Sequence, residues 1–240
     1  MQKKMTRNPY IKYARIYPAI VAMIIPCLAS TYYVYKLGIL NEYFTQFSSC
    51  VKMLALFVPS ALLYSAIGYL GVEVFRSISK ILFQYGLFGE DETNMPTTDL
   101  LIFSHSTFSE TYINRIINKI EKDFHISIKS KEEQRRNETE ARKEIVNAVQ
   151  CIREKTRDNE ILLQYNIQFG FCRNLMGGLV VASMISVALI IACLTQGMSC
   201  RIQVAFLGIE LIAFLLSFWF LKYRGKAYAK QLYAAYLTKK

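Results

Sequence analysis

Four long apolar runs stand out from an otherwise polar chain. They cover Ile16–Tyr35, Val51–Val72, Leu175–Thr195 and Ile202–Leu221. Each has the roughly 20 residues that a helix needs to cross about 30 Å of hydrocarbon. The first run is too long for the apolar part of a secretory signal, and no small-residue cleavage site follows it. The pattern therefore predicts an all-α integral membrane protein with four transmembrane helices.

The segment between the second and third runs shows the periodicity of amphipathic helices. Ile113, Ile116 and Ile120 share one helical face, and Ile145 and Val149 share a face further along. This segment is therefore predicted to form a small helical insertion between spans two and three.

Three local signals predict where helices in this region begin and end. Thr107 with Glu110, and Ser130 with Glu133, have the spacing of a capping box at a helix start. Span two is expected to continue as one helix until the glycines at 86 and 89 end it.

Basic residues are concentrated at both ends of the chain. The tails 1–15 and 222–240 carry Lys and Arg but no acidic residue, and the links between paired runs carry few charges. Because cytoplasmic loops are enriched in Lys and Arg, both termini and the central segment are predicted to be cytoplasmic. The net charge of +11 then reflects topology, since the central segment is slightly acidic. No direct binding to duplex nucleic acid is expected.

These boundaries divide the chain into five parts. A basic cytoplasmic tail, 1–15, precedes transmembrane helices 1 and 2 in 16–72. A cytoplasmic helical region, 73–172, precedes transmembrane helices 3 and 4 in 173–221, and a basic cytoplasmic tail helix, 222–240, follows. The hydrophobic share of 53% and the mean hydropathy of +0.22 are higher than a soluble domain of this size would have.

Residues for catalysis are scarce. The histidines are His105 and His125, and no zinc-protease, Walker or dinucleotide-binding motif is present. The six cysteines lack a metal-binding spacing. We therefore expect that the protein is not an enzyme and that it has no catalytic residue, metal or cofactor. Cys50 and Cys200 both fall at outer ends of spans, where they are either free thiols or a disulfide pair.

Glu210 lies near the middle of the fourth apolar run, where a carboxylate costs roughly 3 kcal/mol on insertion scales. No basic residue lies at the same depth. Its partner is therefore a hydroxyl such as Ser60, Tyr64 or Ser186, a water-filled cavity or another copy of itself. Either Glu210 is a buried hydrogen-bonding group, or it belongs to a ring that lines a cation path. Glu210, Ser186 and Ser60 are the pore or gating candidates.

Small residues recur at intervals of four along the third span, at Gly178, Ala182 and Ser186. Such a row lets membrane helices approach closely, either within one chain or between subunits. Pro26 and Pro59 remove backbone donors from spans one and two, so neighbouring groups must satisfy the freed carbonyls.

Polar residues and a glycine lie close together where the third run begins. Arg173 and Asn174 precede Gly177, where a cytoplasmic helix enters the membrane. In one interpretation these residues anchor the helix at the interface. In the other they form a ligand-responsive hinge, because glycine lowers the cost of bending.

Three stretches carry a resemblance to a known group. They are MPTTDLL at Met95–Leu101, ARKEIVNAVQCIR at Ala141–Arg153 and NIQFGFCRNLMGG at Asn166–Gly178. With the four-span layout, they resemble the small membrane effectors of bacterial anti-phage defence operons, of the CBASS and Hailong kinds. The resemblance implies a homo-oligomeric channel or pore in the bacterial inner membrane, which depolarises an infected cell. A nucleotide second messenger or an operon-encoded protein would control it.

Two classes of function remain. In the first, the protein is a gated channel or pore. It would then be a homo-tetramer or pentamer, because four spans alone enclose little volume. In the second, it is a non-conducting, membrane-anchored sensor or scaffold that recruits a cytoplasmic partner. A transporter is disfavoured because the spans show no inverted repeat or broken-helix signal.

Overall fold

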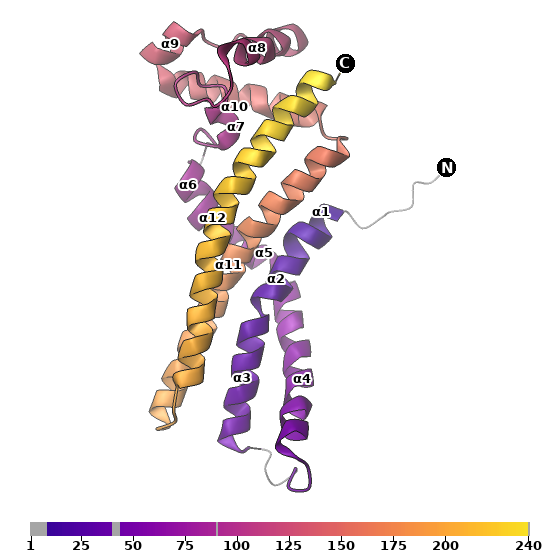
Figure 1. Ribbon diagram of the computed structural model, residues 1–240, viewed down its shortest axis with the longest axis vertical. Coiled ribbons are helices and arrows are strands. Elements are labelled where there is room, and N and C mark those ends of the chain that lie inside the picture. The colour runs from indigo at the N-terminus through magenta and orange to yellow at the C-terminus, as the bar shows by residue number, and fades with distance from the viewer. Residues whose placement is uncertain (1–8, 40–43, 90, 240) are drawn as a thin grey trace, which may run out of the picture. The chain divides into compact units, whose positions relative to one another are not determined.

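The computed structural model describes residues 9–39, 44–89 and 91–239, and all regular secondary structure in these ranges is helical. Residues 1–8 and 240 of the predicted basic tails lie outside the described residues. In chain order (Figure 1) the elements are α1 (Pro9–Ile11), the π-helix η1 (Lys12–Ile16), α2 (Tyr17–Ala22), α3 (Ile24–Leu37), α4 (Ser49–Leu70), α5 (Val72–Ser79), the π-helix η2 (Lys80–Tyr85), α6 (Gly86–Phe88), α7 (Pro96–Asp99), α8 (Glu110–Phe124), α9 (Lys131–Arg136), α10 (Glu138–Lys155), α11 (Glu160–Thr195) and α12 (Arg201–Thr238).

Four helical segments in the described chain are long and apolar enough to cross a membrane. They are Pro9–Leu37, Ser49–Leu70, Glu160–Thr195 and Arg201–Thr238. Each overlaps one of the predicted apolar runs. The prediction of an all-α chain with four candidate spans is thus confirmed, while membrane integration and sidedness stay predictions.

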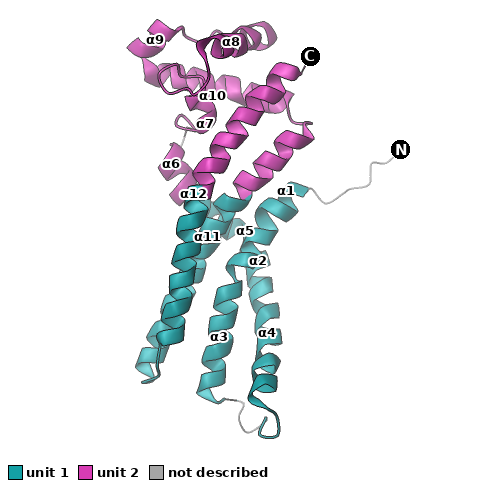
Figure 2. Cartoon of the chain, viewed as in Figure 1, with its two compact units in different colours: residues 1–79, 171–219 teal, residues 80–170, 220–240 magenta. Residues whose placement is uncertain are grey.

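The chain forms two compact units (Figure 2). Unit 1 comprises Met1–Ser79 and Phe171–Trp219, and unit 2 comprises Lys80–Gly170 and Phe220–Lys240. The C-terminal residues therefore fold with the central segment, whereas the sequence pattern placed them in a separate tail. The reason is packing, since Tyr233 and Tyr236 are 0% exposed and belong to the same apolar cluster as the central helices.

The first span of unit 1 is not a single α-helix. The π-helix η1 precedes α2, and the helix breaks at Met23, where φ is −87° and ψ is −3°. Two prolines account for both changes. Pro18 cannot donate to the carbonyl of Ala14, and Pro26 cannot donate to that of Ala22, while each proline ring crowds the same carbonyl.

The second span begins at Ser48, whose hydroxyl accepts a hydrogen bond from the Val51 N–H over 3.4 Å. α4 lies alongside α3 (Figure 1). The predicted continuation of this span is interrupted at Gly71 between α4 and α5, and it adopts π geometry in η2. The helical course ends at Gly89, where φ is +77°, a value that favours glycine.

Unit 2 has an apolar core to which α8, α10 and the end of α12 contribute. Ile116, Ile120 and Ile145 are 0% exposed, as the helical periodicity predicted. Other buried members of this core are Leu101, Ile113, Ala141, Val149, Ile152 and Leu232.

The two predicted capping boxes have different outcomes. Ser130 and Glu133 form one, with the Ser130 N–H donating to Glu133 Oε2 over 2.8 Å. The other is wrong, because Ser109 rather than Thr107 caps α8, accepting a hydrogen bond from the Tyr112 N–H over 3.3 Å. Both hydroxyl residues precede the helix, so spacing alone could not choose between them.

Candidate functional site

Polar side chains recur at every seventh position along the part of α12 that belongs to unit 1. Gln203, Glu210 and Ser217 are 1%, 0% and 7% exposed. Because seven residues make almost two full helical turns, these three side chains share one face, which we call the polar seam. The large apolar side chains of the same helix are exposed instead, including Val204, Ile209, Leu211, Ile212, Leu215 and Leu216.

Glu210 lies at the centre of the polar seam and contacts α11. Its Oε1 accepts a hydrogen bond from the Ser186 hydroxyl over 2.9 Å. Ser186 was one of the three hydroxyl partners that the sequence suggested. The other carboxylate oxygen, Oε2, and Oε1 of Gln203 are buried with no hydrogen-bond partner among the described residues. Since an unpaired buried acceptor costs about 1–3 kcal/mol, the polar seam is incompletely satisfied.

An apolar groove lies between α11 and α12 beside the polar seam. Its volume is about 700 Å³. Ser183, one turn before Ser186, is its hydroxyl-bearing member, and Glu210 is not part of its lining. The other side chains that line the groove are Val180, Met184, Val187, Ala188, Ile191, Leu207, Leu211 and Phe214. A lining of this kind suits hydrocarbon rather than an ion.

The predicted row of small residues on α11 meets several neighbours rather than one. Each four-residue step turns the row by about 40° around the helix. A Cβ added at Gly178 would lie 2.6 Å from the Cβ of Ala22 in α2. Ala182 packs in an apolar cluster with Ala22 and Phe75, while Ser186 faces α12. In this structure the row thus packs within one chain.

Gly177 allows α11 and α5 to approach backbone to backbone. A Cβ added at Gly177 would lie 2.0 Å from the carbonyl oxygen of Phe75 and 2.9 Å from Cβ of Ser79. α11 is continuous from Glu160 to Thr195 through this point. The glycine therefore serves a close crossing, and the helix is unbroken at the predicted hinge.

Asn174 joins three segments of unit 1 one turn before this crossing. Its side chain is 2% exposed. Its amide nitrogen donates to the carbonyl of Ala14 over 2.5 Å, and its Oδ1 accepts a hydrogen bond from the Ser79 hydroxyl over 3.3 Å. The Ala14 carbonyl is the one that Pro18 leaves without its helical donor. Asn174 thus meets the requirement that proline imposes on a membrane helix.

Ser60 is engaged away from Glu210. Its hydroxyl lies 2.6 Å from that of Thr31 in α3, and it donates to the carbonyl of Leu56 over 2.6 Å. Tyr64 packs against the apolar cluster that includes Ala22. Among the predicted pore residues, the structure therefore brings Ser186 and Glu210 together and leaves Ser60 to join α3 with α4.

The six cysteines of the chain are all free thiols. Cys50 is exposed and Cys200 is partly buried, and the alternative of a bridge between them is not formed in this structure. No group of three or more His, Cys, Asp or Glu side chains in the described part of the chain is placed to hold a metal ion.

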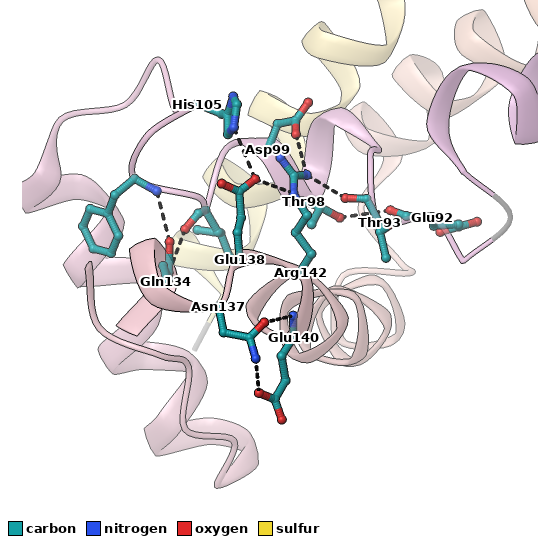
Figure 3. A network of polar contacts seen from close by, with 12 residues as sticks. Glu92, Thr93, Thr98, Asp99, His105, Gln134, Asn137, Glu138, Glu140 and Arg142 are labelled. Atoms are coloured by element: carbon teal, nitrogen blue, oxygen red, sulfur yellow. Dashed lines mark hydrogen bonds and ion pairs between the residues drawn. The ribbon is translucent and has the colours of Figure 1, made fainter. Parts of the chain in front are cut away.

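A separate polar network holds the residues before α8 against α10 in unit 2 (Figure 3). Arg142 donates to Asp99 Oδ1 over 2.9 Å, to Glu138 Oε1 over 2.8 Å and to the Thr93 carbonyl over 2.8 Å. His105 lies 3.3 Å from the same Glu138 oxygen. The hydrogen bond from Arg142 lowers the pKa of the Glu138 carboxyl. Because these charged groups pair with one another, the network favours a structural role.

Comparison with known proteins gives no family model, no curated protein and no solved structure that matches the chain. The resemblance to four-span defence effectors accordingly stays a prediction.

Two members of the polar seam were missed at the sequence level. Gln203 and Ser217 are the polar residues seven positions before and after Glu210 in an apolar run. That spacing is a signal that could have found them. The contact of Asn174 with Ala14 gave no such signal, because the two residues are far apart in the sequence.

Proposed function

We propose that the chain is a membrane effector that forms a gated cation pathway as a homo-oligomer. The observation that carries the proposal is the polar seam of Gln203, Glu210 and Ser217. From Gln203 to Ser217 the helix rises by 14 residue steps, or roughly 21 Å, a large part of the hydrocarbon thickness. A row of polar groups along an otherwise apolar stretch of helix is what an ion path requires.

The described state supports a closed form of such a pathway. Glu210 is fully buried against α11, and its Oε1 is occupied by Ser186. Because Glu210 bonds Ser186 of α11, separation of α11 from α12 would expose Glu210. Both Glu210 and Gln203 have a buried oxygen without a partner among the described residues. Water or a cation would then satisfy those oxygens, which lowers the cost of opening.

The signal for opening is proposed to reach the spans through unit 2. Residues Glu160–Gly170 of α11 belong to unit 2, and Phe171–Thr195 of the same helix belong to unit 1. α12 is divided in the same way after Trp219. The family resemblance adds that a nucleotide signal or a partner protein acts there, in the inner membrane of a bacterium during phage defence.

Ion flux through liposomes that contain the purified chain tests the pathway. Glu210→Gln is expected to lower cation selectivity, and Glu210→Lys to lower cation flux further, because a buried positive charge repels cations in a weakly screened path. Ser186→Ala and Ser60→Ala are matched hydroxyl deletions. Only the first removes a contact of Glu210, so only Ser186→Ala should change flux.

Two outcomes would contradict the pathway. Flux and selectivity that are unchanged in Glu210→Gln, Glu210→Lys and Glu210→Leu would leave Glu210 as a hydrogen-bonding group. A wild-type chain that never conducts, or that stays monomeric by native mass spectrometry in mild detergent, would exclude the oligomeric pore.

The scaffold alternative rests on one observation of its own. Ser186 satisfies Glu210 Oε1 within a single chain, as expected for a residue that only joins two helices. In that case Glu210→Leu would lower stability by about 1 kcal/mol without any effect on ion flux.

Topology provides an independent test of the membrane assignment. Single-site labelling in intact cells is expected to reach Gln196, in the link between α11 and α12, from outside. Asn137, the N-cap of α10, should react only after the cells are opened. Asn41, in the other short link, lies outside the described residues and is expected to behave as Gln196 does. Reaction of Asn137 from outside would overturn the positive-inside assignment.

A further inference from the structure

Unit 1 gathers three arginines from three segments that are far apart in the sequence. Arg15 lies in η1, Arg76 in α5 and Arg173 in α11. Asn174, the neighbour of Arg173, donates to the Ala14 carbonyl and accepts a hydrogen bond from the Ser79 hydroxyl, so α11 meets the segments of Arg15 and Arg76 at this point. Among the described residues, Arg15 and Arg76 both pair with the carboxylate of Glu73, whose Oε1 lies 3.3 Å from Arg15 and whose Oε2 lies 2.9 Å from Arg76.

The charge balance of this arginine cluster is positive. Glu73 is ionised at neutral pH, because the hydrogen bond from Arg76 lowers the pKa of its carboxyl. The two guanidinium groups of Arg15 and Arg76 therefore share one carboxylate. The surplus is accessible, since the side chains of Arg15 and Arg76 are 23% and 36% exposed.

Hydrogen-bond donors are also in surplus. The guanidinium groups of Arg15 and Arg76 each carry five N–H donors, and Glu73 provides one oxygen to each of them. The Nε of Arg15 is buried with no hydrogen-bond partner among the described residues. A planar guanidinium group can bind two phosphate oxygens at once. A phosphate group would therefore supply both the negative charge and the hydrogen-bond acceptors that Glu73 does not provide.

We propose that Arg15, Arg76 and Arg173 form a binding site for a phosphate-bearing anion. Arg15 precedes the first apolar run, Arg76 follows the second and Arg173 precedes the third. These positions correspond to the membrane surface, where the phosphate of an anionic lipid lies, and a soluble phosphate compound has the same chemistry. The site is separate from the polar seam and does not depend on ion conduction.

Binding is tested on the full chain in an uncharged detergent. The probes are short-chain phosphatidylglycerol, phosphatidylcholine of equal chain length and inorganic pyrophosphate, and native mass spectrometry or calorimetry gives the affinities. Arg15→Gln and Arg76→Gln are each expected to weaken binding about tenfold, the size of one charge-assisted contact. These two are chosen because they are the more exposed, so the fold should tolerate them.

A variant of opposite sign sharpens the test. Glu73→Gln removes the carboxylate that competes with the ligand, so it should tighten binding several-fold. Lys52→Gln is the control. Lys52 lies near the start of α4, at the far end of the second span from Arg76, so its removal should leave binding unchanged. Raising the salt concentration should weaken binding to the wild type, because ions screen partly exposed charges.

Each outcome has a defined meaning. Binding of phosphatidylglycerol but not pyrophosphate, lost in the arginine variants, supports the site and identifies the source as lipid. Pyrophosphate binding with the same dependence on the variants supports the site and identifies a soluble ligand. Absence of binding by both probes, equal affinity in Arg15→Gln, Arg76→Gln and the wild type, or weaker binding by Glu73→Gln would overturn the proposal.

Discussion

Units 1 and 2 are both helical, yet they differ in the side chains that they bury and expose. In unit 2 the buried positions include Ile116, Ile145 and Ile152, all 0% exposed. In unit 1 the buried positions include alanines, serines, Asn174, Gln203 and Glu210, and large apolar side chains lie on the surface, with Leu62 69% and Leu70 78% exposed. Unit 1 also buries a few large side chains, such as Met23 and Phe75, but its exposed leucines and buried polar groups invert the pattern of unit 2.

The inversion is what two different solvents would produce. In water, helices associate because burial removes apolar surface from the solvent. In hydrocarbon that driving force is absent, so helices associate through small residues and hydrogen bonds while their large apolar side chains face the lipid. Unit 2 follows the first rule and unit 1 follows the second. The comparison thus favours a membrane for unit 1 on grounds of packing as well as hydropathy.

The largest expected effect comes from removing a large apolar side chain in each unit. Ile116→Ala in unit 2 should lower the free energy of unfolding by about 2–5 kcal/mol, because it leaves a cavity in a closed core. Leu62→Ala in unit 1 should change it by less than about 0.5 kcal/mol, since that side chain is exposed. Pulse proteolysis of both variants in the same detergent measures the difference. Equal losses would break the comparison.

A smaller effect is expected from adding one methyl group to a glycine of unit 1. Gly177→Ala places a Cβ against the Phe75 carbonyl and should destabilise the chain by about 1–3 kcal/mol. Gly208→Ala is the matched control, because a Cβ there meets nothing within 4 Å. That control should be neutral or slightly stabilising, as alanine favours helix. Thermal unfolding in detergent checks both, and a neutral Gly177→Ala would show that α11 does not need its close crossing.

The smallest expected effect is a pH dependence of unit 2. A hydrogen bond from Lys155 lowers the pKa of the Asp123 carboxyl, and one from Arg142 lowers that of Glu138. A carboxyl group whose pKa is lowered by folding stabilises the fold above its unfolded pKa and loses this contribution as the pH falls through its folded value. Unit 2 should thus weaken below about pH 4, by less than about 1 kcal/mol per group.

Amide hydrogen exchange in unit 2, followed from pH 6 to pH 3.5 and corrected for the intrinsic rate, measures this change. Asp123→Asn should reduce the dependence. Protection in unit 2 that is equal at both pH values would contradict the assigned pairs.

The sequence alone predicted the number of spans, the apolar faces of α8 and α10, and the capping box at Ser130. Each of these depends on residues a few positions apart, where hydropathy and local hydrogen bonds dominate. It also marked Glu210 as a group that needs a partner and Ser186 as one candidate for that partner, because a carboxyl group inside an apolar run must be satisfied. It did not choose among three hydroxyl groups, since depth in the membrane limits the candidates but does not show which helices are neighbours.

Tertiary structure alone decided the rest. It placed Tyr233 and Tyr236 in the core of unit 2, directed Asn174 to the carbonyl that Pro18 leaves free, and brought Arg15 and Arg76 together at Glu73. Except for Arg76 and Glu73, which are neighbours on one helix, these contacts join residues separated by 58 positions or more. Which of the many donors in the chain meets a given acceptor is determined by how the helices cross, and a helix crossing depends on side-chain volumes from several segments at once.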